Sequence, residues 1–170
     1  MGYNDYGRKS YGRFNDSGRN TGGPVSNNSN SNENIIYNPF VGLTEENYVE
    51  LAEKAIDALG NHKNKDNKPQ ILTTSKIRNI LALNAEIYND VINESSEQLS
   101  EDIRGRINYL KVRVIYEAGR EPTVKFFVNE SHLLDNINSI KGQKKQYLLF
   151  SRYLEALVAY RKFKYGKDEN

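Results

Sequence analysis

Several residue types and patterns are missing from this sequence, and each absence excludes a class of protein. The chain of 170 residues contains no cysteine, so it can form neither disulfide bonds nor zinc–thiolate sites. No apolar run reaches the roughly 20 residues that a membrane-spanning helix needs, and the polar N-terminal segment lacks the apolar stretch of a signal peptide. We therefore expect a protein without membrane spans that works in the cytoplasm.

The residues of common catalytic and metal sites are also scarce. His62 and His132 are the only histidines, and neither stands at a spacing typical of metal ligands. The sequence also lacks a Gly-rich phosphate-binding loop and the Gly-x-Ser-x-Gly motif of serine hydrolases. It therefore predicts no catalytic residue, no metal ligand and no cofactor site, and an enzyme is disfavoured.

Net charge is +2, but the charges are segregated along the chain. Residues 44–60 carry five acids and one base, and residues 84–102 carry six acids and no base. Residues 103–125 carry six bases against two acids, and residues 141–167 carry eight bases against one acid. One surface facing a polyanion and another facing basic neighbours would explain this pattern, and so would an unevenly charged solvated surface.

The N-terminal segment differs from the rest of the chain. Residues 1–34 contain no leucine or isoleucine and consist mostly of Gly, Asn, Ser, Tyr and Arg. Such a composition buries too little apolar area to offset the entropy lost on ordering, so we predict that residues 1–42 form a disordered tail and connector. Its tyrosines and arginines are suited to stacking on bases and contacting phosphates. Loose RNA binding and simple solubilisation are both consistent with this segment.

From residue 43 onward, apolar residues recur at intervals of three and four, which predicts helices throughout. Hydroxyl side chains stand at several predicted helix starts as suitable N-caps, and Pro122 suits a first helical turn. The pattern predicts five helices, over residues 44–60, 74–91, 100–119, 122–140 and 144–165. The fifth is apolar over most of its circumference, so we expect the other four to pack around it. Residues 43–170 are therefore predicted to be an all-α domain, a compact five-helix bundle.

The third predicted helix carries the most suggestive polar pattern. Five residues recur at spacings of three and four on one side of it, namely Arg106, Tyr109, Arg113, Tyr116 and Arg120. Such a ridge would follow RNA phosphates and offer rings for stacking. Alternatively, the tyrosines pack on a neighbouring helix while Arg113 pairs with Glu117 one turn later. A weaker candidate is Lys76 with Arg78 at the start of the second helix, where main-chain amides also attract phosphate.

Five stretches of the chain, in this order, resemble the small subunit of type III-A (Csm-type) CRISPR effector complexes. They are Leu-Thr-Glu-Glu-Asn-Tyr-Val at 43–49, Leu-Thr-Thr-Ser-Lys-Ile-Arg at 72–78, Tyr-Leu-Lys-Val at 109–112, Val-Ile-Tyr-Glu-Ala-Gly-Arg at 114–120 and Arg-Tyr-Leu-Glu-Ala-Leu-Val-Ala-Tyr at 152–160. The resemblance extends to residue 168, departs slightly at Tyr165-Gly166, where the family often has Gly-Gly, and leaves out the tail.

This resemblance implies a non-catalytic subunit of a ribonucleoprotein in antiviral defence. It implies that several copies stack into a minor filament beside the backbone and large subunits, and that they contact the sugar-phosphate backbone of crRNA and target RNA. It directs attention to Arg78, Lys111, Arg120 and Arg152, which fall inside the matching stretches. With the residues chosen by spacing, the predicted RNA-binding set is Lys76, Arg78, Arg106, Lys111, Arg113, Arg120 and Arg152. A purely structural spacer, whose bases bridge acidic surfaces of adjacent copies, is the alternative.

Overall fold

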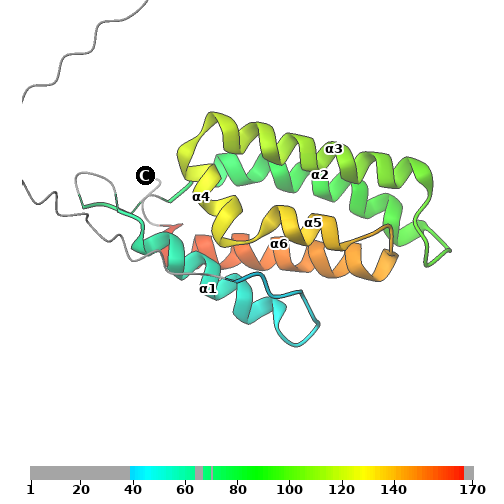
Figure 1. Ribbon diagram of the computed structural model, residues 1–170, viewed down its shortest axis with the longest axis horizontal. Coiled ribbons are helices and arrows are strands. Elements are labelled where there is room, and N and C mark those ends of the chain that lie inside the picture. The colour runs from blue at the N-terminus through cyan, green and yellow to red at the C-terminus, as the bar shows by residue number, and fades with distance from the viewer. Residues whose placement is uncertain (1–38, 64–66, 70, 167–170) are drawn as a thin grey trace, which may run out of the picture. The chain divides into compact units, whose positions relative to one another are not determined.

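The computed structural model describes residues 39–63, 67–69 and 71–166 (Figure 1). These residues belong to one unit that spans 37–170. Within the described ranges every regular element is a helix, and the only β-type contacts are two isolated bridges. The predicted all-α fold is therefore confirmed, whereas the predicted disordered tail lies, up to residue 38, outside the described residues.

The described residues form six helices rather than the predicted five. They are α1 (Tyr48–Asn61), α2 (Thr74–Asn93), α3 (Glu101–Arg120), α4 (Pro122–Glu130), α5 (Leu133–Ser139) and α6 (Lys144–Tyr165). The start of α1 also differs, because Thr44 and Asn47 bond to each other before the helix begins. The Thr44 amide donates to Asn47 Oδ1 at 2.7 Å, and the Asn47 amide donates to Thr44 Oγ1 at 3.2 Å.

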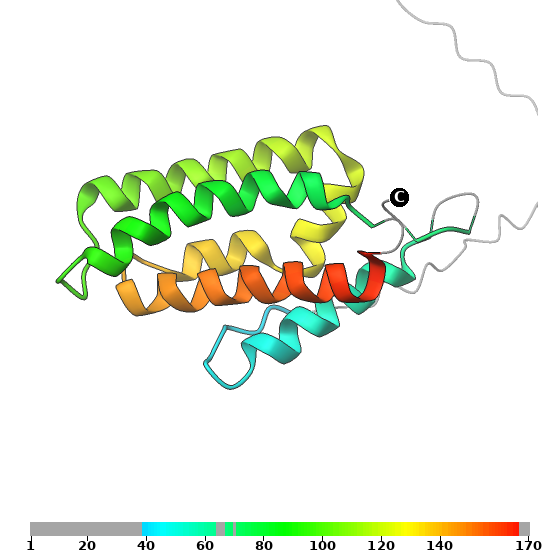
Figure 2. The same ribbon diagram turned by 180° about the vertical axis from the view of Figure 1, so that it is seen from behind.

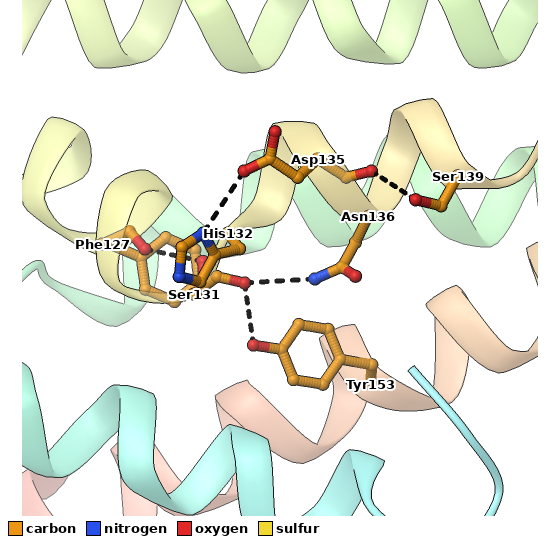
Figure 3. A network of polar contacts seen from close by, with 7 residues as sticks. All are labelled: Phe127, Ser131, His132, Asp135, Asn136, Ser139 and Tyr153. Atoms are coloured by element: carbon orange, nitrogen blue, oxygen red, sulfur yellow. Dashed lines mark hydrogen bonds and ion pairs between the residues drawn. The ribbon is translucent and has the colours of Figure 1, made fainter. Parts of the chain in front are cut away.

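The additional helix arises because the predicted fourth helix breaks at Ser131 and His132 (Figure 3). His132 adopts a left-handed backbone with φ of 47°, and Ser131 Oγ donates to the Phe127 carbonyl at 2.6 Å. The Ser131 carbonyl accepts hydrogen bonds from the Asn136 side chain at 3.2 Å and from the Tyr153 hydroxyl at 2.8 Å. These side-chain donors satisfy a buried carbonyl where the helical ladder stops, so the chain turns without exposing it.

The helices pack in layers, with α2 and α3 along one edge, α5 and α6 in the middle and α1 along the opposite edge (Figures 1 and 2). Helix α6 packs against α1, α2 and α5, as its wide apolar circumference predicts. Helices α3 and α4 pack mainly on other helices, so the prediction that all four remaining helices surround α6 is only partly confirmed. In the described ranges, no helix is long and apolar enough to cross a membrane.

Buried polar groups connect α2 to α6 inside this core. Asn84 donates from its side chain to Ser151 Oγ at 2.7 Å, and the Tyr147 hydroxyl lies 2.9 Å from both oxygens of Asn84. Buried polar groups are costly unless they are paired, so this network favours one register of the two helices. Burial raises the pKa of the Tyr147 hydroxyl above the ordinary value of 10.0.

A buried arginine near the C-terminal end of α6 holds the segment that precedes α2. Arg161 is only 3% exposed; its Nε donates to the Leu72 carbonyl at 3.0 Å, and its Nη1 donates to Thr74 Oγ1 at 2.9 Å. Charged donors form stronger hydrogen bonds than neutral ones. The start of α2 is therefore tied to the end of α6.

Candidate nucleic-acid interface

The bases of α3 fall into two rows on different sides of the helix. Arg106, Arg113 and Arg120 recur every seven residues and form one row, whereas Arg104 and Lys111 form the other. Residues two positions apart project roughly 200° apart around a helix axis, so the rows lie on nearly opposite sides. The inner face between them holds the predicted core stripe, with Ile103, Ile107, Leu110 and Val114 buried and Ala118 partly buried.

The row of three arginines is largely neutralised by carboxylates of the chain itself. Arg106 pairs with Asp90 on α2, and Arg113 Nη2 lies 3.2 Å from Glu117 Oε1. Arg120 approaches the other oxygen of Glu117 at 3.9 Å, and both Arg113 and Arg120 stack over the Tyr116 ring at 5.5 Å from its centroid. The Arg113–Glu117 pair of the alternative prediction is thus confirmed, whereas its other part is wrong, because Tyr109 and Tyr116 are exposed and do not pack into a neighbouring helix.

The second row borders a basic hollow between α3 and the turn that joins α5 to α6. Arg104, Lys111 and Lys141 supply its charge around a volume of about 270 Å³. The remaining residues that line it are Ile107, Asn108, Ile137, Asn138, Ile140 and Gly142, so none of the lining residues is acidic. Across the described residues, none of the three bases forms an ion pair. We name this site the basic hollow.

The turn before α6 places Lys141 at the rim of this hollow. Lys141 and Gly142 are both left-handed, with φ of 45° and 73°. A Cβ on Gly142 would lie 2.7 Å from Gln98 Nε2 and 2.9 Å from Arg104 Cδ, so glycine lets the arginine stem pack across the turn. The Gly142 carbonyl also accepts a 2.8 Å hydrogen bond from the Leu99 amide. The turn is therefore held against the segment that leads into α3.

The other predicted bases lie apart from the basic hollow. Lys76 Nζ lies 2.8 Å from Glu121 Oε1, at the junction of α3 and α4. Arg78 is exposed and lies two residues further along α2, so it projects from nearly the opposite side of that helix. On α6, Arg152 Nη1 donates to both oxygens of Glu45, at 2.7 and 2.9 Å.

The seven predicted residues therefore do not form one surface. Among them, the structure brings only Lys111 to the basic hollow, and Arg104 and Lys141 were missed. Two sequence signals point to the missed residues: Arg104 precedes Lys111 by two helical turns, and Lys141 precedes a glycine between two helices. Neither signal reveals that α3 and the Lys141 turn meet, because that contact depends on how α5 packs against both neighbours.

The two histidines have structural surroundings. His62 stacks on Phe126 with centroids 4.8 Å apart, and its Nε2 lies 2.9 Å from Glu130 Oε1. His132 Nδ1 lies 3.2 Å from Asp135 Oδ2 at the break between α4 and α5 (Figure 3). In the part of the chain that the structure describes, no group of three or more His, Asp or Glu side chains is arranged to hold a metal ion.

Comparison with known proteins identifies relatives over most of the chain. The profile of the family described as Csm2 Type III-A matches residues 45–167. A protein of Streptococcus thermophilus named CRISPR system Cms protein Csm2 is 42% identical over 127 residues, which cover 74% of this chain and 98% of the relative. Proteins of the same name from Mycobacterium tuberculosis are 33% identical over 129 residues, or 76% of this chain and all of the relative. A protein of that name from Enterococcus italicus is 45% identical over 94 residues, or 54% of this chain and 67% of the relative.

Proposed function

The chain belongs to the Csm2 family of type III-A CRISPR systems, and from this membership we propose that it is the non-catalytic small subunit of a type III-A ribonucleoprotein. In this proposal several copies stack into a filament beside the backbone and large subunits of the complex. Basic side chains of each copy contact the sugar-phosphate backbone of crRNA and target RNA, without reading the base sequence. The complex acts in antiviral defence in the cytoplasm.

The basic hollow is the observation that most supports RNA contact. Its three bases line one hollow that no acidic side chain lines, so a phosphate there would meet positive charge without a neighbouring carboxylate. Lys141 holds a left-handed backbone that costs a non-glycine residue about 1–2 kcal/mol. Strained positions of this kind concentrate at binding sites, so the lysine side chain itself is the expected reason that glycine does not occupy the position.

The row of arginines on α3 is less suited to RNA binding than the basic hollow. Its three guanidinium groups share two carboxylates, Asp90 and Glu117. Surface ion pairs of this kind contribute only about 0–1 kcal/mol, so an incoming phosphate can replace a carboxylate at small cost. The net positive charge of the row is nevertheless small. Arg106, Arg113 and Arg120 are therefore proposed to assist RNA binding rather than to dominate it.

The alternative of a purely structural spacer has its own support. Five of the seven predicted bases already pair with carboxylates of the chain, namely Lys76, Arg106, Arg113, Arg120 and Arg152. Bases with carboxylate partners are suited to exchanging those partners for the acids of an adjacent copy. A spacer would need no contact with RNA. The two proposed functions therefore differ in one respect: the basic hollow contacts RNA in the first and does not contact RNA in the second.

Charge reversal in the basic hollow separates these functions. Arg104→Glu with Lys111→Glu should reduce RNA bound by the purified complex about tenfold or more while the subunit remains incorporated, because repulsion replaces two phosphate contacts. Lys125→Glu with Lys162→Glu is the matched control, since both lysines are exposed and lie away from the hollow. Unchanged RNA content together with loss of the subunit from the complex would favour the spacer.

A further inference from the structure

The outward face of α3 carries a group of exposed apolar and aromatic side chains; among the described residues, the guanidinium groups of Arg113 and Arg120 cover part of it by stacking over the Tyr116 ring. Tyr109, Val112, Ile115 and Tyr116 are 57%, 57%, 48% and 52% exposed. Spacings of three, four and seven residues place most of this set on one face, opposite the buried stripe of the same helix. A continuous exposed apolar face of this kind marks an interaction site more often than single exposed apolar residues do. We name these four residues the α3 face.

Two glycines on the same side of α3 allow a close approach. A Cβ added to Gly105 or Gly119 would meet no atom within 4 Å, so packing within the chain does not require glycine at either position. Glycine in a helix interior costs about 1 kcal/mol relative to alanine. Both glycines border the α3 face, where the missing side chains would let a partner backbone come closer.

A second apolar set lies at the opposite edge of the unit. Val49 on α1 is 42% exposed, and Phe40 and Val41 in the segment before α1 are 42% and 50% exposed, with the Phe40 ring 5.7 Å from the ring of His132. With the α3 face they account for seven of the nine large apolar side chains that are exposed in the described ranges. Figures 1 and 2 both place α1 and α3 along opposite edges, with α5 and α6 between them. We name Phe40, Val41, Val49 and the acids of 45–57 the α1 edge.

The two surfaces carry opposite charge. Three bases border the α3 face, Arg106, Arg113 and Arg120, and they share two carboxylates, Asp90 and Glu117, which leaves an excess of one positive charge. The α1 edge carries five acids, and the bases that contact them are Lys54, Arg152 and Lys164. The α1 edge therefore has an excess of two negative charges, so one surface of each kind attracts weakly, whereas two surfaces of the same kind repel weakly.

We infer that the α3 face of one copy docks on the α1 edge of the next copy, in a head-to-tail contact. Surfaces that are complementary to each other but not to themselves give a heterologous interface, and their position at opposite edges leaves one of each free after every contact. The inference rests on the proposed stacking and assigns its two surfaces. It also divides the bases of α3, because Arg113 and Arg120 then face the neighbouring copy while Arg104 and Lys111 remain at the basic hollow.

Cross-linking in the assembled complex tests this contact directly. The chain has no cysteine, so pairs of introduced cysteines react without background. A chain with both Val49→Cys and Val112→Cys, treated with a bis-maleimide in the purified complex, should give a ladder of cross-linked dimers, trimers and larger species. Each single-cysteine chain should give no cross-linked dimer of the subunit, because equivalent residues do not meet in a heterologous contact.

A matched control tests for non-specific cross-linking, and a second variant tests the contact without cross-linking. Cysteines at Ala85 and Asn129, both exposed and outside the two surfaces, should give no ladder at the same reagent concentration. Val112→Glu should weaken incorporation of neighbouring copies about tenfold or more, because a carboxylate would be buried among apolar groups beside Val49. Circular dichroism of the free chain should remain unchanged, since Val112 is exposed.

Two results would overturn the inference. One is a complex that retains several copies and RNA but gives no ladder with the double-cysteine chain. The other is a dimer formed by Val112→Cys alone, which would show an isologous contact through α3. Neither result would touch RNA binding through the basic hollow. Conversely, the complex could give a normal cross-linked ladder while its RNA binding is unchanged by substitution of Arg104 and Lys111. That result would refute RNA contact at the basic hollow but would still support the docking contact.

Discussion

Removal of charge from the basic hollow should change the salt dependence of RNA binding by a predictable amount. The variant combines Arg104→Gln, Lys111→Gln and Lys141→Gln, which keep the aliphatic stems and remove three positive charges. Each phosphate neutralised on a single strand contributes about 0.7 to the slope of log affinity against log salt, so loss of three contacts should lower the slope by about 2. Between 50 and 200 mM salt, that difference corresponds to about a 16-fold smaller loss of affinity in the variant.

The assay is fluorescence anisotropy of a labelled target RNA bound by the purified complex over that salt range. The control variant combines Lys63→Gln, Lys125→Gln and Lys162→Gln, three exposed lysines outside the hollow. It has the same net charge as the hollow variant, so a general effect of charge would alter both slopes equally. A hollow variant whose slope equals that of the unmodified complex would refute phosphate contact at this site.

Three further predictions concern the free chain. Lys141→Gly should raise the free energy of unfolding by about 0.5–1 kcal/mol in urea titrations, because glycine adopts the left-handed backbone without strain, and should weaken RNA binding at the same time. Tyr147→Phe should lower the free energy of unfolding by about 1–3 kcal/mol, because the buried oxygens of Asn84 lose a donor. Burial raises the pKa of the Tyr147 and Tyr153 hydroxyls above 10.0, so stability should be full below about pH 10 and fall at higher pH, where the unfolded chain loses these protons first. The tyrosinate absorbance that Tyr147→Phe removes reports the ionisation of Tyr147 among the twelve tyrosines of the chain. It should rise together with the loss of helical circular dichroism, and a rise well before unfolding would contradict the burial of Tyr147.

The helices were predictable from the sequence because apolar spacing is a local signal. Four of the five predicted helices are present as single elements, with ends that shift by a few residues. The break at Ser131 was not predictable, since neither glycine nor proline marks it. It depends on the Tyr153 hydroxyl, which comes from another helix and satisfies the Ser131 carbonyl. A tertiary donor of this kind leaves no local pattern.

The candidate site was predictable only in part, for a similar reason. Helical spacing correctly separates the arginines of α3 from its core stripe, whereas Lys111 was singled out by the family resemblance and not by spacing. Which bases are neutralised depends on side chains from other elements, such as Asp90 beside Arg106 and Glu45 beside Arg152. Lys141 lines the same hollow as Lys111 because of the turn that Gly142 permits. The distribution of charge along the sequence therefore indicates a basic helix, but it does not indicate which bases of that helix lack a carboxylate partner.

The connection from α1 to α2 is held at both ends, and this makes it a suitable place for grafted peptides. At one end the His62 ring stacks on Phe126 and its Nε2 lies within hydrogen-bond distance of Glu130, and at the other end Arg161 donates hydrogen bonds to Leu72 and Thr74. With both ends fixed, doubling the number of residues between them costs only about 0.6 kcal/mol of closure entropy. An affinity tag or a fluorescent label inserted between His62 and Leu72 should leave the helical bundle intact. This position lies outside the basic hollow and the α3 face.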